Sequence, residues 1–416
     1  MGKSFYIHTL GCKVNWCDSN SMAIALIENG WILEKSKEKA LVYILNSCTV
    51  TEKADADVRK YARKAKIDAK GPRFVVVTGC AAVTATATLK KIPEIDLVVL
   101  KTELDLLLDQ INTFWNRLKQ EETHEKSNIF ADERQRRFVK IQDGCDQFCA
   151  YCIVPFARGV PKSSPCELIL KEVNAAAAEG IKEVILTGIH IARYDDNGKD
   201  LQGLLREILL GTKIERIRLG SLESEFITSE LMKLISSEER IMPHLHIPLQ
   251  SGSNKILIAM NRKSTREQFC ENLEAFQKLK LSVVSLDIIV GFPGETEQDF
   301  LETLQIIEKY DFIKIHAFPF SARKGTKAAE MKKLFVKSSI IKERMQRLKI
   351  AADNSAQRCR TSFLNYEFDV LVESNENGRC EGFTQNYIRV AFDANVSPRQ
   401  IVKVKLGMPG VTFLEQ

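Results

Sequence analysis

Three cysteines close together in the sequence form the first candidate metal site. Cys145, Cys149 and Cys152 lie in the stretch DGCDQFCAYCIV with the spacing C-x3-C-x2-C, and no fourth cysteine or histidine follows closely. A structural zinc site uses four ligands, usually from two Cys or Cys/His pairs, and only a distant residue such as His190 could complete one here. A cubane 4Fe–4S cluster held by three thiolates instead leaves one iron open to an outside ligand. The spacing therefore favours an iron–sulfur cluster over zinc or structural cysteines.

Three further cysteines each follow a predicted strand. Cys12, Cys48 and Cys80 come two residues after apolar, strand-like segments that helical patterns separate. The segments are residues 4–10, 40–46 and 73–78. Strands that alternate with helices form a parallel sheet, and all its strands end on one side. The three thiols are therefore expected along the carboxyl edge, where open α/β sheets bind ligands. Free cysteines often only fill space in a core, but three in register favour a shared metal site.

Strands and helices continue to alternate, on a larger scale, from Arg136 to about Arg360. Six segments are strand-like: 137–142, 182–188, 216–221, 244–251, 281–291 and 312–320. Six such units predict a partial parallel (βα)6 barrel, whose site lies at the carboxyl ends of the strands by analogy with complete βα barrels. The loop that contains Cys145 directly follows the first of these strands, so we expect it at that mouth.

The predicted domain order follows from these patterns. Residues 1–116 form an open parallel α/β sheet domain, residues 117–135 are a polar, charged linker, and residues 136–360 form the partial barrel. Residues 361–416 contain short alternating strands with no helix between them, which predicts a small all-β barrel.

Composition sets wide limits on function. The chain has 416 residues, of which 44% are hydrophobic and 27% charged, as in a globular protein. No apolar segment approaches the roughly 18 residues that span a bilayer, and the N-terminus does not resemble a secretory signal. We therefore expect a cytoplasmic protein, in which eleven cysteines point to metal binding or catalysis before disulfides. The net charge of +6 permits a nucleic-acid partner without requiring one.

A C-x3-C-x2-C loop after the first strand of a βα partial barrel resembles the radical S-adenosylmethionine (SAM) superfamily. Longer motifs extend over about residues 3–406: LGCKVN, NSCTVTEKADADVRKYARKA, VVVTGC, GCDQFCAYCIVPFARG, LTGIH, HLHIPLQSGSNKILIAMNR, DIIVGFPGET and AFPFSARKGT. With these motifs the chain resembles the methylthiotransferases, most strongly the branch that acts on N6-threonylcarbamoyladenosine in tRNA. The resemblance implies an auxiliary 4Fe–4S cluster on the three N-terminal cysteines and an RNA-binding TRAM module in the C-terminal domain.

The same resemblance implies the reaction. A tRNA methylthiotransferase of this branch inserts a methylthio group at carbon 2 of N6-threonylcarbamoyladenosine, next to the anticodon, with two 4Fe–4S clusters and SAM as cofactors. The hydrogen at that carbon is unactivated, so a radical route carried by a cofactor suits the chemistry better than an acid or base side chain. The implied partners are the anticodon stem-loop of tRNA and an electron donor such as flavodoxin or ferredoxin. The default expectation for the assembly is a monomer.

Barrel residues at strand ends are carried over as candidate SAM contacts. They are Tyr151, Thr187, Gly188, Ser221, Glu223 and Gln250. Glycine at 188 would let the backbone approach the amino-acid end of SAM closely. Each of the polar residues could equally be one that only solvates the barrel rim.

Three residues are candidates for substrate contact. The Arg158 guanidinium could pair with the threonyl carboxylate of the substrate base, since its fork suits a carboxylate, or it could bind phosphate. Tyr387 and Arg389 in the tail offer an aromatic and a cationic group of the kind that small β-barrels present to single-stranded RNA. Strand alternation would put both on one face, although core packing remains the default expectation for Tyr387.

Other activities remain open at this point. The same enzyme class also acts on isopentenyladenosine in tRNA or on an aspartate of a ribosomal protein, and the LGCKVN motif favours the threonylcarbamoyl branch by resemblance alone. A different class of protein would be a non-enzymatic RNA-binding protein whose fold is stabilised by a structural metal ion. Metal content separates these hypotheses, because two cubane clusters require about eight irons per chain.

Overall fold

The computed structural model describes residues 3–69, 71, 73–118 and 135–414. They form two compact units. The N-terminal unit contains the N-terminal residues together with two short segments from later in the chain, Cys152–Val160 and Ser321–Gly325. The barrel unit contains the other residues from Gln135 onward. Most of the predicted linker, 117–135, lies outside the described residues, and its first two residues belong to helix α5 (Leu104–Leu118).

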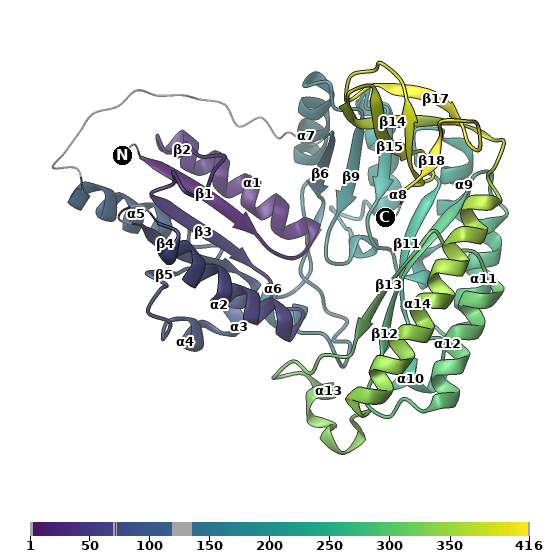
Figure 1. Cartoon of the computed structure of the whole chain (residues 1–416), viewed down its shortest axis with the longest axis horizontal. Helices are drawn as coiled ribbons and strands as arrows, with labels where there is room; N and C mark the ends of the chain where they lie inside the picture. Colours follow the sequence, from purple (N-terminus) through teal and green to yellow (C-terminus); the bar gives the residue numbers. More distant parts are fainter. Residues whose placement is uncertain (1–2, 70, 72, 119–134, 415–416) are drawn as a thin grey trace. The chain divides into compact units, whose positions relative to one another are not determined.

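The N-terminal unit contains a parallel sheet with the strand order β2-β1-β3-β4-β5 (Figure 1). Its strands are β1 (Ser4–Thr9), β2 (Ile32–Leu33), β3 (Val42–Ser47), β4 (Phe74–Gly79) and β5 (Leu97–Val98). Its other helices are α1 (Lys13–Glu28), α2 (Glu52–Ile67), α3 (Cys80–Thr84), α4 (Thr86–Leu89) and α6 (Val154–Arg158). Strand β3 is buried over its whole length, as expected for a parallel strand covered on both faces. The predicted open parallel sheet is confirmed.

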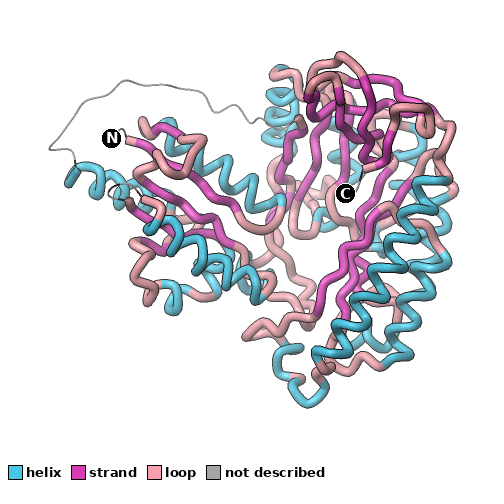
Figure 2. The backbone as a smooth tube through the Cα atoms, in the orientation of Figure 1, coloured by secondary structure: helices cyan, strands magenta, loops and turns pink. Residues whose placement is uncertain are grey.

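The barrel unit is built on six parallel strands, which confirms the predicted partial barrel (Figures 1 and 2). They are β6 (Arg136–Lys140), β9 (Glu183–Thr187), β10 (Arg216–Leu219), β11 (His244–Gln250), β12 (Val283–Val290) and β13 (Lys314–Pro319). They form two three-stranded sheets, β10-β9-β6 and β11-β12-β13, which single bridges such as Ser221 to His246 connect. A short antiparallel pair, β7 (Gln142–Asp143) with β8 (Lys162–Ser163), lies beside the cysteine loop in the sequence.

Helices cover the outer face of this barrel, and apolar side chains from most of them pack into its core. They are α7 (Cys166–Ala178), α8 (Leu201–Gly211), α9 (Ser229–Ser237), α10 (Asn254–Ala259), α11 (Arg266–Gln277), α12 (Glu297–Lys309), α13 (Lys327–Glu330) and α14 (Ser338–Thr361). No helix in the described part of the chain is long and apolar enough to cross a membrane.

The C-terminal residues form a five-stranded antiparallel sheet with the order β17-β14-β15-β16-β18. The strands are β14 (Glu367–Glu376), β15 (Arg379–Thr384), β16 (Arg389–Asp393), β17 (Ile401–Lys405) and β18 (Thr412–Phe413). Buried apolar residues such as Phe368, Val370 and Ile388 fill one face of this sheet. The predicted all-β character of the tail is confirmed.

This C-terminal sheet packs against the amino-terminal ends of the barrel strands. Tyr387 stacks on His244, the first residue of β11, with ring centroids 4.6 Å apart, and on Phe383 at 4.8 Å. The guanidinium of Arg218 in β10 lies 4.6 Å from the centre of the Tyr387 ring, a distance suited to cation–π attraction. Tyr387 is therefore a packing contact between the barrel and the C-terminal sheet.

A buried ion cluster lies beside this contact. Glu183, the first residue of β9, is fully buried and accepts hydrogen bonds from Arg218 at 2.8 and 3.1 Å. Burial would raise the pKa of Glu183, but its arginine neighbours outweigh burial and lower it. Arg216 donates to the backbone carbonyl of Asp369 in the C-terminal sheet at 2.7 Å. The charge cluster and the sheet are thus packed as one body.

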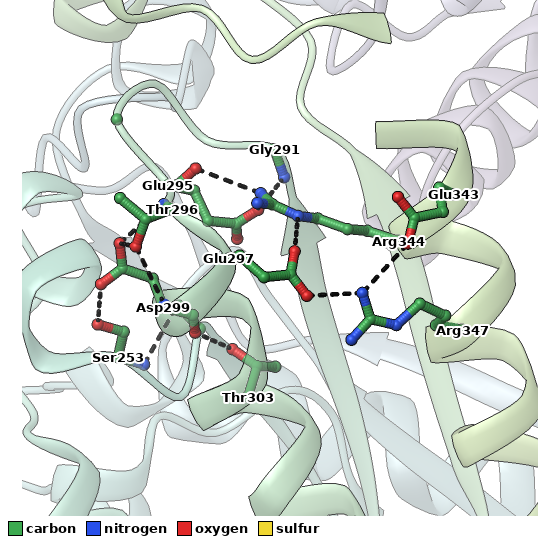
Figure 3. Close-up of polar contacts among 12 residues, drawn as sticks. Ser253, Gly291, Glu295, Thr296, Glu297, Asp299, Thr303, Glu343, Arg344 and Arg347 are labelled. Carbon is green, nitrogen blue, oxygen red and sulfur yellow. Dashed lines mark hydrogen bonds and ion pairs between the residues drawn. The ribbon is translucent and has the colours of Figure 1, made fainter. Parts of the chain in front are cut away.

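The motif GFPGET, between β12 and α12, anchors the loop at the carboxyl end of β12 (Figure 3). Thr296 and Asp299 form a capping box at the start of α12, each side chain bonding the other's backbone N–H. The Asp299 carboxylate also accepts from the Ser253 hydroxyl at 2.8 Å and lies 2.6 Å from the Lys255 ammonium. Arg344 of α14 donates to Glu295 at 2.8 Å. The loop is therefore fixed to both α10 and α14.

Candidate metal centres

The loop that contains Cys145 and Cys149 is pinned by backbone hydrogen bonds. The Ala150 amide donates to the Met260 carbonyl and the Ala328 amide donates to the Ala150 carbonyl, both at 2.8 Å. The Cys145 sulfur accepts from the amide of Gln147 at 3.4 Å. Phe148, between the two cysteines, has a φ of 45°, a left-handed conformation that few residues adopt. The loop conformation is thus imposed by its neighbours, which is common at functional sites.

His190 connects Cys145 to a carboxylate. Its Nδ1 lies 3.9 Å from the Cys145 sulfur, and its Nε2 lies 3.0 Å from the Glu223 carboxylate. The His190 backbone amide donates to the Gln142 side chain at 2.8 Å, which orients the segment. Burial would lower the pKa of His190, but the bonds to Cys145 and Glu223 outweigh burial and raise it to about 9. His190 thus links the first cysteine of the loop to a buried carboxylate.

Arg262 places a second cation beside the loop. Its Nη1 lies 3.9 Å from the Cys149 sulfur, while its Nη2 donates to the Pro248 carbonyl at 3.0 Å. Burial raises the pKa of the Cys149 thiol, and the Arg262 charge opposes that rise. Burial would lower the pKa of Arg262, but the charges of Tyr151 and Cys149 outweigh it and raise this pKa. Its buried Nε has no hydrogen-bond partner among the described residues. An unsatisfied buried N–H is costly, so this side of the loop suits an anionic sulfur or ligand.

The predicted SAM contacts lie at or near the carboxyl ends of the barrel strands. Thr187 is the last residue of β9, and a Cβ at Gly188 would come within 2.8 Å of the Gln142 carbonyl, so only glycine fits there. Gln250 ends β11 with a φ of 71°, a strained conformation for a side chain of this size. Ser221 pairs with β11 through its bridge to His246. These positions remain predictions for SAM binding.

Cys12, Cys48 and Cys80 come together at one edge of the N-terminal sheet. Burial raises the pKa of the Cys48 thiol, and the charges of Cys80 and Cys12 raise it further. Burial likewise raises the pKa of Cys80, with Cys12 adding to the rise. A Cβ on Gly11 would lie 2.8 Å from the Cβ of Cys48, so the loop before Cys12 lies directly against the Cys48 side chain. The parallel pairing of β1, β3 and β4 thus places the three cysteines at one edge of the sheet, as the strand spacing predicts.

The donor groups of the two cysteine sets can be compared with those that an iron–sulfur cluster requires. Among the residues that the structure describes, no three His, Cys, Asp or Glu side chains are grouped closely enough to hold one metal ion. Thiolates of a cubane each bind a different iron and need not converge on one point. Each set also has N–H donors beside sulfur, as cluster sulfurs prefer: Gln147 at Cys145, and the amides of Thr49 and Val50 at Cys48. The donor chemistry at both sites thus fits an iron–sulfur cluster.

The structure gives the predicted substrate contacts different surroundings. The Arg158 side chain is only 2% exposed and bonds Asn15 and Asp18. Tyr387 lies in the turn before β16 with a φ of 71°, so the prediction that strand alternation puts it on the same face as Arg389 is wrong. Arg389 is partly exposed and pairs with Glu381 at 2.7 Å.

Sequence reasoning gave no role to Asn15 and Arg262, two polar residues near the thiols, and it did not pair Glu223 with His190. Asn15 and Arg262 stand inside quoted motifs, LGCKVN and HLHIPLQSGSNKILIAMNR, which was the available signal. Their contacts depend on residues far away in the sequence, which no local pattern reveals.

Comparison with known proteins shows which families the chain resembles. Residues 139–307 match the family model of the radical SAM superfamily, and residues 4–100 match the model described as uncharacterized protein family UPF0004. A solved structure of the radical SAM methyltransferase TsrM from Kitasatospora setae shares the fold, with a TM-score of 0.55 at 12% identity over 77% of this chain and 75% of the other.

Two curated relatives match nearly the whole chain. A Bacillus subtilis protein named threonylcarbamoyladenosine tRNA methylthiotransferase MtaB is 36% identical over 98% of this chain and 94% of its own length. A Pelagibacter ubique protein named tRNA-2-methylthio-N(6)-dimethylallyladenosine synthase is 35% identical over 95% of this chain and 93% of its own length. Identity at this level, over almost the full length, shows that the chain belongs to the radical S-adenosylmethionine methylthiotransferase family.

Proposed function

We propose that the protein is a tRNA methylthiotransferase that inserts a methylthio group at carbon 2 of N6-threonylcarbamoyladenosine next to the anticodon. The observation that carries this proposal is the presence of two separate cysteine triads, one of them gathered from three strand ends of the N-terminal sheet. A radical SAM enzyme that only cleaved SAM would need the Cys145–Cys149–Cys152 loop alone. A second triad fits an enzyme that must also supply sulfur.

The chain's own residues have distinct tasks in this proposal. Cys145, Cys149 and Cys152 hold one 4Fe–4S cluster, and His190 and Arg262 each lie 3.9 Å from a sulfur of this set, at Cys145 and Cys149 respectively. The SAM contacts are Tyr151, Thr187, Gly188, Ser221, Glu223 and Gln250. A bound cluster supplies an electron, and SAM supplies the adenosyl and methyl groups.

The N-terminal triad has the second task. Cys12, Cys48 and Cys80 hold the auxiliary 4Fe–4S cluster, at the sheet edge where α/β folds bind ligands. Each set of three thiolates leaves one iron free for a non-protein ligand. Two cofactor sites of this kind suit a reaction that needs both a radical and a source of sulfur.

The proposal also covers the RNA substrate, the electron donor, the location and the assembly of the enzyme. The substrate is the anticodon stem-loop, the C-terminal sheet is a TRAM-type RNA-binding module with Arg389 on its surface, and the electron donor is a flavodoxin or ferredoxin. The proposed location is the cytoplasm, where free cysteines are kept reduced, and a monomer is proposed as the default assembly.

Nucleoside mass spectrometry of tRNA from a deletion strain tests the substrate. The account predicts that 2-methylthio-N6-threonylcarbamoyladenosine disappears and that its precursor without the methylthio group accumulates. Loss of the methylthio group from isopentenyladenosine instead would favour the second candidate, for which the Pelagibacter ubique relative is the supporting observation. An unchanged tRNA profile would contradict both.

A further inference from the structure

Two arginines reach the N-terminal unit from segments that lie far along the chain. Arg158 belongs to Cys152–Val160 and Arg323 to Ser321–Gly325, and both segments group with the N-terminal unit although the sequence around them belongs to the barrel unit. Helix α6, which ends at Arg158, packs on α3, which begins at Cys80. These segments are therefore part of the surroundings of the N-terminal cysteines.

Asn15 is the first link between the cysteine loops. This side chain is 1% exposed and lies one turn after Cys12. Its amide nitrogen donates to the Leu10 carbonyl at 2.7 Å and to the Ser47 carbonyl at 3.0 Å. Leu10 precedes Cys12 by two residues and Ser47 directly precedes Cys48. One buried amide thus ties together two of the three loops.

Arg158 adds the third loop to this link. Its Nη2 donates to the Asn15 side-chain oxygen at 2.6 Å and to the Asp18 carboxylate at 3.1 Å. Helix α6, which ends at Arg158, packs on α3, whose first residue is Cys80. A planar guanidinium can hold several acceptors in fixed directions, which an ammonium cannot. Arg158 therefore connects the Asn15 link to the loop of Cys80.

Arg323 makes a second, separate link beside Cys48. Its Nη2 donates to the Thr49 hydroxyl at 2.7 Å and to the Asp55 carboxylate at 2.6 Å. Thr49 directly follows Cys48, and its hydroxyl also accepts from Thr84 at 3.1 Å. Thr84 is the last residue of α3, the helix that begins at Cys80. Arg323 thus fixes the exit of the Cys48 loop against the helix of Cys80.

We infer that Arg158 and Arg323 are positioning residues for the auxiliary site, which hold the loops of Cys12, Cys48 and Cys80 in the arrangement that receives the second cluster. This inference rests on the proposed function, since it assumes that these thiols bind a cluster. It gives Arg158 a role different from the substrate contact expected from its motif, because a side chain so buried and so fully engaged is not open to a carboxylate of the substrate base.

The test uses a full-length background in which Cys145, Cys149 and Cys152 are replaced by alanine, so that only the N-terminal triad can hold a cluster. After anaerobic reconstitution this background should contain about four irons per chain. Adding Arg158→Gln or Arg323→Gln should speed iron loss to a chelator roughly tenfold or more, as is typical when a residue behind metal ligands is lost. The electron paramagnetic resonance spectrum and the reduction potential of the reduced cluster should also shift.

Two further variants make the result decisive. Arg158→Lys keeps the charge but loses the fork, so its iron retention should lie between that of the background and that of Arg158→Gln. Arg206→Gln is the matched control: Arg206 pairs with Glu230 on the surface of the barrel unit and is 49% exposed, so its loss should change nothing. Thermal unfolding of each iron-free variant shows whether the variant is folded. If Arg158→Gln does not fold, the iron retention of Arg158→Lys is compared with that of the background instead.

Background-like iron retention, spectrum and potential in the folded arginine variants would overturn the inference. A background that binds no iron while both arginines are intact would instead contradict the auxiliary cluster itself. The two failures are therefore distinguishable.

Discussion

At the scale of single residues, the two sites differ in how much of them a sequence can reveal. Cys145, Cys149 and Cys152 are adjacent in the chain, so their spacing alone suggests a cluster. Asn15 and Arg262 act through contacts with loops more than thirty residues away, such as the Asn15 bond to Ser47. A buried asparagine or arginine has no local signature, because its role depends on which carbonyl or thiol the fold brings near it.

Cysteine variants separate the two proposed clusters by their products. Cys149→Ala should abolish formation of 5′-deoxyadenosine, because the loop at the barrel strands loses a ligand. Cys48→Ala should leave deoxyadenosine formation intact but eliminate the methylthio product. Cys380→Ala is a suitable control, because Cys380 is buried in the core of the C-terminal sheet and belongs to neither set. Both products are measured by liquid chromatography and mass spectrometry, and normal methylthio product from Cys48→Ala would contradict the auxiliary assignment.

At the scale of elements, apolar patterns located the strands better than the helices and turns. The predicted helix at residues 21–30 is the second half of α1, which begins at Lys13 directly after Cys12. Residues 13–20 carry no clear apolar stripe, so periodicity could not extend the helix backward. Strands β2 and β5 have two residues each, too few for any alternation to appear. The single segment predicted at 379–393 is two strands, because the backbone turns at Tyr387.

The contact between Tyr387 and the barrel predicts a stability effect. Tyr387→Ala should lower the free energy of unfolding by about 2–3 kcal/mol, because it removes an aromatic stack and exposes the ring's neighbours His244 and Phe383. Tyr366→Ala, in the same region but 52% exposed, should cost roughly 0.5 kcal/mol or less. Urea unfolding of the iron-free proteins measures both. Equal effects of the two variants would show that the stack does not hold the C-terminal sheet.

The capping box at α12 predicts an acid dependence. Burial would raise the pKa of Asp299, but its bonds to Lys255, Thr296 and Ser253 outweigh burial and lower it from 3.8 to about 2. A carboxyl group whose pKa is lower in the folded state stabilises the protein above its unfolded pKa and loses that contribution as the pH falls. Asp299→Asn should therefore cost about 2 kcal/mol near pH 7, and this cost should shrink progressively below about pH 4–5.

Chemical unfolding of wild type and Asp299→Asn over this pH range provides the measurement. Asp353→Asn serves as the control, because its ion pair with Lys349 lies on an exposed face with Asp353 itself 64% exposed. The control should differ little from wild type at any pH, as surface pairs contribute little. A cost for Asp299→Asn that does not change with pH would show that ionisation of Asp299 does not stabilise the loop.

At the scale of the whole molecule, the sequence predicted the order of architectures but not how the chain divides. Alternation of strands and helices, followed by strands alone, indicated an open sheet, a partial barrel and an all-β tail, and the structure has all three. Contacts nevertheless group Cys152–Val160 and Ser321–Gly325 with the N-terminal unit. The domains expected from the sequence, 1–116, 117–135, 136–360 and 361–416, are continuous ranges and so cannot include this grouping. Short segments from late in the chain that pack with the N-terminal unit have no distinctive composition by which to recognise them.

The central claim, that two cysteine triads each hold a cubane, is tested most directly by iron and sulfide analysis of anaerobically reconstituted protein. Wild type should contain about eight irons and eight sulfides per chain, and about four of each should remain when either triad is replaced by alanine. About four irons in wild type, lost entirely on replacement of Cys145, Cys149 and Cys152 and unaffected by replacement of Cys12, Cys48 and Cys80, would contradict it.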